Sequence, residues 1–119
     1  MRFYKNLWVG KQAAGKKWRI LWSLKHFRPL KDVFVLILAR TPHDLIHIYP
    51  SEEFLQPYYK KRSRELFVIG IACGKQEALE LVCRIVEEVY RETGGCDIRR
   101  YIKLKAGKGS DAVYFVDNH

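Results

Sequence analysis

The chain has 119 residues, of which 48% are hydrophobic, and its formal net charge at pH 7 is +9. A domain of this length buries about two-thirds of the surface that its unfolded chain exposes, so we expect one domain with its own core. The longest apolar run, 33–39, is much shorter than the roughly 18 residues of a membrane span, so we expect no membrane-spanning segment.

The first predicted element is a helix over residues 12–27. Its polar stripe, at steps of three and four residues, consists of Gln12, Lys16, Arg19, Ser23 and His26. Its apolar stripe, which we assign to the core, consists of Ala14, Trp18, Leu21 and Trp22. Gly15 weakens the beginning of the pattern, so a start at Lys16 is the alternative. Residues 27–32 then predict a turn, because the residue before Pro29 disfavours helical geometry.

Two short strands are predicted next, over residues 33–40 and 45–49. The residues TPHD between them are typical of a turn, so we expect an antiparallel hairpin. The first run is almost entirely apolar, as in a central strand, whereas the second alternates and belongs nearer an edge.

A short helix is predicted to begin at Ser51, which we expect to cap it. Glu52 and Glu53 follow, where the helix dipole favours negative charge. Pro57 should break this helix near Gln56, because proline lacks the amide hydrogen that the helix needs.

The clearest strand and the clearest helix follow each other directly. Residues 65–73 are rich in β-branched and aromatic residues and predict a strand. Residues 75–93 carry apolar residues at helical spacing, and the glycines after them predict the helix end.

The last part of the chain predicts a strand around 98–104 and a flexible connection over 106–110. For the apolar segment 112–116 three alternatives remain open: it covers a sheet edge, pairs with a neighbouring chain, or is disordered. The element order α-β-β-α-β-α-(β) predicts an α+β fold. We expect a single domain over 1–105, with an antiparallel or mixed sheet of about three to five strands and helices mainly on one face. Residues 106–119 would add the flexible connection and an edge strand or tail.

The segment GIACGK, residues 70–75, matches a phosphate-binding P-loop only in outline. A P-loop has four residues between its glycines and a Ser or Thr after its lysine. Here three residues separate Gly70 from Gly74, and Gln76 follows Lys75. We predict that Gly70 relieves crowding in a strand and that Gly74 turns the chain into its helix. A weak anion contact at Gly74 and Lys75 is the alternative.

The histidines and cysteines predict no metal site, cofactor or catalytic residue. In an extended strand His43 and His47 lie roughly 13 Å apart, too far to share an ion. Of the three cysteines, Cys73, Cys83 and Cys96, only Cys73 precedes a predicted helix, and we interpret all three as reduced thiols of a cytoplasmic protein. An enzyme acting on a phosphorylated small molecule near Lys75 is the third of our hypotheses.

The functional prediction depends on where the positive charge lies. Residues 1–31 contain nine Lys and Arg and no Asp or Glu, while the remaining thirteen basic and thirteen acidic residues balance. Basic residues are interleaved with aromatic ones here and in 58–64, a combination typical of nucleic-acid surfaces. The predicted polyanion-binding residues are Lys11, Lys16, Lys17, Arg19, Lys25, Arg28, Lys60, Lys61 and Arg62.

The first hypothesis is therefore a binding module for nucleic acid or another polyanion, such as an acidic protein surface. The second is an interaction module that forms a homo-oligomer through the tryptophan-rich helix or the segment 112–116. A membrane-surface helix uses the same residue types, but the apolar stripe is short for that role.

Overall fold

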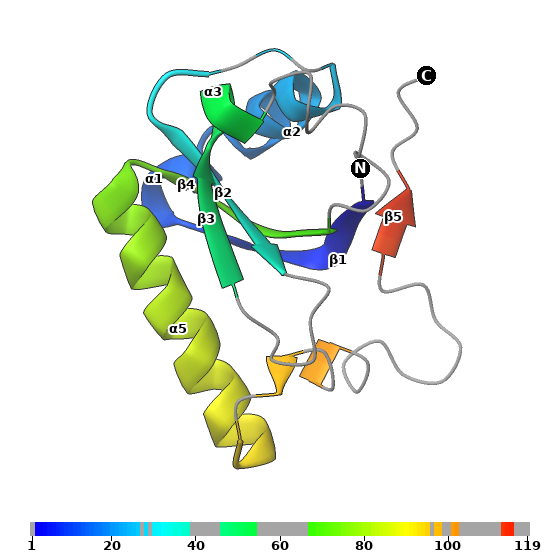
Figure 1. The fold of residues 1–119 in the computed structure, drawn as a ribbon, viewed down its shortest axis with the longest axis vertical. Helices are drawn as coiled ribbons and strands as arrows, with labels where there is room; N and C mark the ends of the chain where they lie inside the picture. Colours follow the sequence, from blue (N-terminus) through cyan, green and yellow to red (C-terminus); the bar gives the residue numbers. More distant parts are fainter. Residues whose placement is uncertain are drawn as a thin grey trace.

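One mixed β-sheet with helices packed against it forms the fold in the computed structural model (Figure 1). The structure describes residues 2–26, 28, 30–38, 46–54, 67–95, 97–98, 101–102 and 113–115. Its elements are β1 (Arg2–Val9), α1 (Lys11–Ala14), α2 (Lys17–Lys25), β2 (Val33–Leu38), β3 (Ile46–Pro50), α3 (Ser51–Phe54), β4 (Phe67–Cys73), α5 (Lys75–Thr93) and β5 (Val113–Phe115). The strands lie in the order β3-β2-β4-β1-β5. Among the described strands, only β1 and β4 are parallel neighbours. The predicted α+β class is confirmed.

The helices divide between the two faces of the sheet, rather than packing mainly on one. Successive side chains of a strand point to opposite faces, and alternate residues of the central strands belong to two separate core clusters. On one face α5 contributes Leu81 and Ile85. On the other face α1 and α2 contribute Ala13, Ile20 and Leu24. Because the central strands are apolar on both faces, each face needs its own cover.

The strand β1 was not predicted, although it lies inside the sheet. It pairs in parallel with β4 and antiparallel with β5. Its register with β4 shifts between Phe3 and Trp8, and such an irregularity interrupts the alternation by which a strand is identified. Phe3, Tyr4 and Trp8 are all buried. The residues of β1 thus pack on both faces of the sheet, although they show no regular alternation in the sequence.

The predicted helix 12–27 is two helices, and α2 buries a different side from the one expected. The break falls at Gly15 and Lys16, where α1 ends and α2 has not yet begun. The buried residues of α2 are Ile20, Ser23 and Leu24. Trp18 and Trp22 are 74% and 49% exposed, so their assignment to the core was wrong. The helix has two apolar arcs and buries only one, and the aliphatic arc packs on the β-branched face of the sheet.

The hairpin of β2 and β3 is confirmed, and β3 is an edge strand as predicted. The helix that follows is short, since α3 ends at Phe54. Ser51 is the first residue of α3, and its hydroxyl bonds the turn before β2. It accepts from the Leu30 amide (3.1 Å) and donates to the Leu30 carbonyl (2.6 Å).

The helix α5 spans the predicted residues 75–93 and runs down one side of the sheet (Figure 1). Gly94 ends it in the left-handed conformation (φ 75°), and its amide bonds the Tyr90 carbonyl. Within the described part of the chain, no helix is long and apolar enough to cross a membrane.

The strand predicted around 98–104 is wrong for the residues that the structure describes there. Ile98, Tyr101 and Ile102 are helical, and all three are buried against the α5 side of the core. Their spacing of three and four residues places them on one side of a helical turn, whereas a strand would separate them. Farther on, Val113–Phe115 forms β5, which covers the β1 edge of the sheet. The predicted connection 106–110 lies outside the described residues.

Candidate nucleic-acid interface

Two outward-facing tryptophans on α2 form the centre of the candidate site. Trp18 and Trp22 are one helical turn apart, so their side chains lie on the same side of the helix. The Lys17 ammonium nitrogen lies 5.1 Å from the Trp18 ring centre, and the Arg28 guanidinium carbon lies 5.4 Å from the Trp22 ring centre. His26 stacks on Trp22 with ring centres 4.3 Å apart and an interplanar angle of 27°. Each tryptophan therefore has a cation beside its ring.

The tryptophans border an apolar groove between α2 and β1. The groove has a volume of about 410 Å³. We call it the tryptophan groove, and its lining is Phe3, Tyr4, Lys5, Leu7, Lys17, Trp18, Leu21, Trp22 and Lys25. Lys5 and Lys25 are exposed, while Lys17 is half-buried. The groove thus combines aromatic and aliphatic walls with three cations, and none of its described lining residues is acidic.

A second cavity lies on the other side of α2. We call it the basic crevice; it has a volume of about 640 Å³, and its lining is Gln12, Lys16, Arg19, Ile20, Leu30, Lys31, Asp32, Val33, Cys73 and Gly74. The predicted polyanion-binding residues are thus split. Lys17, Lys25 and Arg28 lie with the tryptophans, whereas Lys16 and Arg19 line the basic crevice.

The turn between β4 and α5 already uses two of its amides. The Cys73 amide donates to the Glu77 carboxylate (2.5 Å), which also accepts from the Gln12 amide (2.6 Å). The Gly74 amide donates to the Asp32 carbonyl (2.6 Å). Gly74 has φ 89°, which is the turning role predicted for it. A weak anion contact at Gly74 and Lys75 stays a prediction, and neither of these two amides is available for it.

Lys11, the remaining predicted residue that the structure describes, does not join the tryptophans. Lys11 lines a separate hollow of about 350 Å³, which also includes Glu77 and Arg84. Lys60, Lys61 and Arg62 lie outside the described residues. Sequence reasoning missed Lys5 and Lys31 as site residues. Lys5 could have been assigned to the site only if β1 had been predicted as a strand. Lys31 could have been assigned to it only if the turn before β2 had been known to lie next to α2.

The described residues offer no metal-binding constellation. No three His, Cys, Asp or Glu side chains among them are grouped as metal ligands. Burial raises the pKa of the Cys73 thiol, and the Glu77 carboxylate raises this pKa further. Cys73 is therefore a thiol rather than a thiolate near neutral pH, which disfavours a nucleophilic role.

The opposite face of β1 carries a third feature, a hollow of about 470 Å³ lined by aromatic and charged side chains. Trp8 stacks on Tyr101 there with ring centres 6.2 Å apart, and the Tyr101 hydroxyl donates to the Glu88 carboxylate (2.6 Å). Burial is the main cause that raises the pKa of both Tyr4 and Tyr101, so these phenols stay neutral. Trp8 and both tyrosines are nearly fully buried, which is typical of core packing.

Comparison with protein-family models, with curated proteins and with solved structures gave no match.

Proposed function

We propose that the protein binds single-stranded nucleic acid across the exposed side of α2. The observation that carries the proposal is the 74% exposure of Trp18 on a helix that buries smaller aliphatic residues instead. Exposed large aromatic side chains on a surface of one charge sign are typical of single-strand binding proteins, in which bases stack on rings and cations follow the phosphates. Residues 1–31 contain no Asp or Glu, so α2 itself presents no negative charge to phosphates.

The positions of the cations around α2 favour a nucleic-acid strand that crosses this helix. Residues of a helix are about 100° apart around its axis, which places Lys17 and Lys25 on the β1 side of the tryptophans and Arg19 on the other side. Lys17 and Lys25 indeed line the tryptophan groove, and Arg19 lines the basic crevice. Phosphates on either side of a stacked base would therefore meet a cation.

The exposed rings favour a single strand over a duplex. Bases in a duplex are paired and stacked on each other, so their flat faces are not available to a protein side chain. A single strand offers these faces without an unpairing cost, and stacking on an aromatic residue contributes about 1–3 kcal/mol per base. The tryptophan groove next to the rings is apolar enough to take an unstacked base.

Tryptophan fluorescence tests this proposal directly. The three tryptophans are Trp8, Trp18 and Trp22; Trp8 is buried with 7% exposure, so quenching by an oligonucleotide would report on α2. We expect Trp18→Ala to weaken binding about five- to hundredfold, the equivalent of one lost stacking contact. With about four phosphate contacts, the logarithm of the affinity should fall with the logarithm of salt concentration at a slope near −3.

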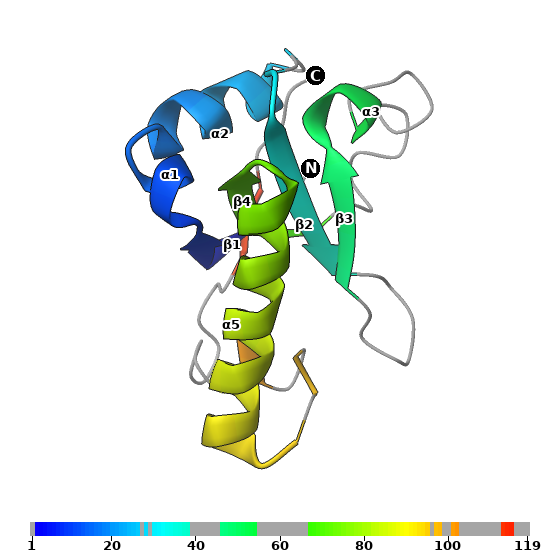
Figure 2. The same cartoon turned by 90° about the vertical axis from the view of Figure 1, so that its left-hand side faces the viewer.

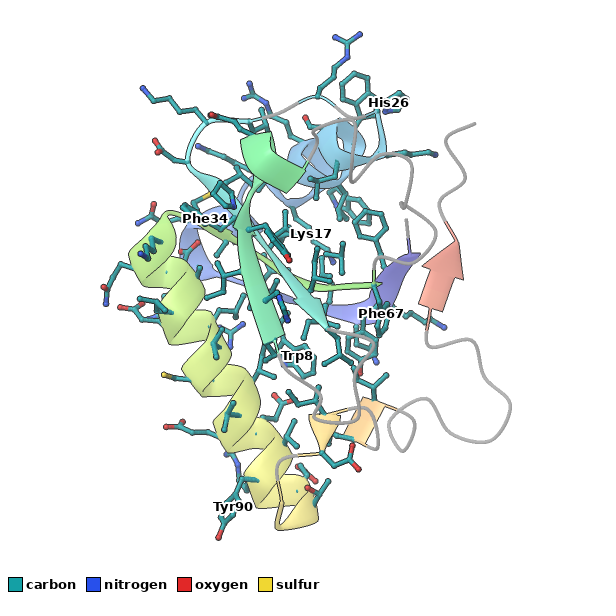
Figure 3. All side chains as sticks on the ribbon, in the orientation of Figure 1. Trp8, Lys17, His26, Phe34, Phe67 and Tyr90 are labelled. Carbon is teal, nitrogen blue, oxygen red and sulfur yellow. The ribbon has the colours of Figure 1, made fainter. Side chains whose placement is uncertain are left out.

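The matched control is Tyr90→Ala, which removes another exposed aromatic ring from the surface. Tyr90 is 61% exposed and points outward near the far end of α5 (Figure 3). Its removal should leave the affinity unchanged. Equal affinity for single and double strands, or full affinity in Trp18→Ala, would refute the proposal. Stronger binding to anionic vesicles than to oligonucleotides would show instead that α2 lies on a membrane surface.

A second candidate function is protein–protein interaction, which the apolar lining of the tryptophan groove favours. Apolar surface that borders exposed tryptophans is also typical of interfaces. If a second copy of the chain covers the groove, light scattering will give a dimer that Trp22→Ala dissociates. A monomer at all concentrations would contradict self-assembly through α2.

A further inference from the structure

The parallel strands β1 and β4 end side by side, and the chain leaves them toward opposite faces of the sheet. Val9 pairs with Ile71 near these ends, and the Gly10 amide donates to the Ile71 carbonyl (3.0 Å). After β1 the chain enters α1 and α2, and after β4 it enters α5, which packs on the other face. Figure 2 shows α2 and α5 in different places beside the strands, while α1 meets the first turn of α5, where the Gln12 amide donates to the Glu77 carboxylate. Connections that diverge in this way leave a crevice outside the carboxyl ends of the strands, where sheet proteins commonly bind ligands.

The basic crevice lies beside this position, between α2, the turn before β2 and the end of β4. Cys73 is the last residue of β4, and Gly74 follows it. Its volume of about 640 Å³ lies within the usual range for small-molecule sites. Three cations line it, namely Lys16, Arg19 and Lys31. One carboxylate, Asp32, lines it with them, so the formal charge of the lining is +2.

The walls of the crevice are fixed by hydrogen bonds. The turn that carries Lys31 is held on one side by the two bonds between Leu30 and Ser51. On the other side the Gly74 amide holds the Asp32 carbonyl at 2.6 Å. Asp32 has φ 61°, a left-handed conformation that few non-glycine residues adopt. The crevice is therefore a preorganised feature between packed elements.

Glu77 does not line the basic crevice; it lines the neighbouring hollow together with Lys11 and Arg84. Its carboxylate accepts hydrogen bonds from the amides of Gln12 in α1 and Cys73 in β4. These backbone donors stabilise its negative charge. Lys16 lies near enough to Cys73 to favour its thiolate electrostatically, in opposition to Glu77 and Asp32. The positive end of the crevice is thus the side formed by α2 and the turn before β2.

We propose that the basic crevice binds a phosphate monoester. A phosphate monoester carries about −1.5 to −2 charges at neutral pH, which matches the +2 of the lining. The planar guanidinium of Arg19 suits two phosphate oxygens at once, and the lysine ammonium groups add point charges. This site is separate from the tryptophan groove, since the two linings share no residue. The proposal does not depend on nucleic-acid binding.

Calorimetric titration with inorganic phosphate tests the site. The titration is made at about pH 8, where phosphate is mostly the dianion, with chloride at equal ionic strength as the reference. We expect wild-type protein to bind phosphate, and Arg19→Ala and Lys31→Ala each to weaken binding at least about tenfold. Lys31→Gln keeps a polar side chain, one atom shorter, and should weaken binding similarly, because the charge is lost.

The matched control is Lys25→Ala, which removes an exposed lysine from the other side of α2. It should bind phosphate as wild type does, and so should Trp18→Ala. No phosphate binding beyond the chloride reference, or equal binding by wild type and Arg19→Ala, would overturn the proposal. Trp18→Ala changes only the tryptophan groove, so it should weaken oligonucleotide binding and leave phosphate binding unchanged. The two proposals can therefore fail independently of each other.

The source of the phosphate follows from two further ligands. If the site receives the end of a strand, a 5′-phosphorylated oligonucleotide will bind more tightly than the unphosphorylated one, and Arg19→Ala will remove the difference. If the site receives a small molecule, ribose 5-phosphate will displace inorganic phosphate while the two oligonucleotides bind equally. Either result supports a phosphate-monoester site. If neither phosphorylated ligand competes with inorganic phosphate, the proposal is contradicted.

Discussion

Replacement of Glu77 by alanine should destabilise the protein more than its place in the first turn of α5 would suggest. The Glu77 carboxylate joins three segments, because it accepts from the amides of Gln12 in α1 and Cys73 in β4 at 2.6 and 2.5 Å. In Glu77→Ala both amides lose this partner. Each hydrogen bond to a charged group contributes about 1.5–3 kcal/mol to the free energy of unfolding. Because Glu77 is half-buried, water can bond the freed amides and recover part of this loss.

We therefore expect Glu77→Ala to lower the free energy of unfolding by about 2–4 kcal/mol. For a domain of this size, such a loss corresponds to a decrease in Tm of roughly 10 °C. The measurement is urea denaturation followed by circular dichroism, with the slope m compared between variants. The matched control is Glu80→Ala, since Glu80 is exposed and bonds only the Gln76 side chain among the interactions described (3.2 Å). Its removal should cost less than about 0.5 kcal/mol.

Gly10 gives a sharper version of the same test. Its backbone has φ −65° and ψ 159°, which alanine adopts easily, but a methyl group there would collide with the Glu77 carboxyl group. In the wild-type background Gly10→Ala should therefore displace Glu77 and cost about 2 kcal/mol. In the Glu77→Ala background the space is free, and the cost should fall below about 0.5 kcal/mol. Additive effects in this double-mutant cycle, or an unchanged Tm in Glu77→Ala, would refute the reasoning.

Three other predictions concern backbone geometry and buried phenols. Gly94→Ala should destabilise by about 1–2 kcal/mol in urea denaturation, because Gly94 ends α5 at φ 75°. Gly70→Ala should cost about 1–3 kcal/mol, because a methyl group there would lie 3.2 Å from both the Trp8 carbonyl oxygen and a Leu81 methyl carbon. Above the ordinary tyrosine pKa of about 10, stability should fall by about 1.4 kcal/mol per pH unit for each buried phenol, since folding raises the pKa of Tyr4 and Tyr101.

Each of these predictions has its own control. Gly15→Ala is the control for both glycines, since no atom lies within 4 Å of a methyl group there and its φ is −71°; a loss of stability as large as in Gly94→Ala would contradict the geometric argument. For the phenols, the neutral form is favoured in the folded state, so their stabilisation is present below pH 10 and is lost as the pH rises. Tyr101→Phe should make the alkaline decrease shallower, and an unchanged pH profile would contradict the assignment.

The sequence by itself determined the elements whose signals are local. The helix α5 is recognisable because apolar residues recur at helical spacing and Gly94 follows them. The strands β2, β3 and β4 are recognisable for the same kind of reason, since short β-rich runs between turn residues have few alternatives. The position of β3 at the edge also followed from its alternation. In each case the information lies within about 20 residues, so no knowledge of distant contacts is needed.

The direction in which α2 faces was decided only by the tertiary structure. Its sequence has an aliphatic arc with Ile20 and Leu24 and an aromatic arc with Trp18 and Trp22, and either arc satisfies helical spacing. In the folded protein the aliphatic arc packs on the sheet, since Ile20 and Leu24 belong to the same core cluster as the β-branched residues of β2 and β4. That packing is what exposes the tryptophans and creates the candidate interface.

The basic crevice likewise exists only through contacts between distant parts of the chain. Its lining combines Arg19, Lys31 and Gly74. Lys31 lies near Gly74 because β2 pairs antiparallel with β4, with Val33 opposite Cys73. Arg19 comes beside them because β1, which leads into α1 and α2, pairs in parallel with β4 across more than half of the sequence. The irregular register of β1 hid that strand from pattern analysis. The sequence showed that positive charge is concentrated in the first 31 residues, but strand pairing alone determined which of those charges share a cavity.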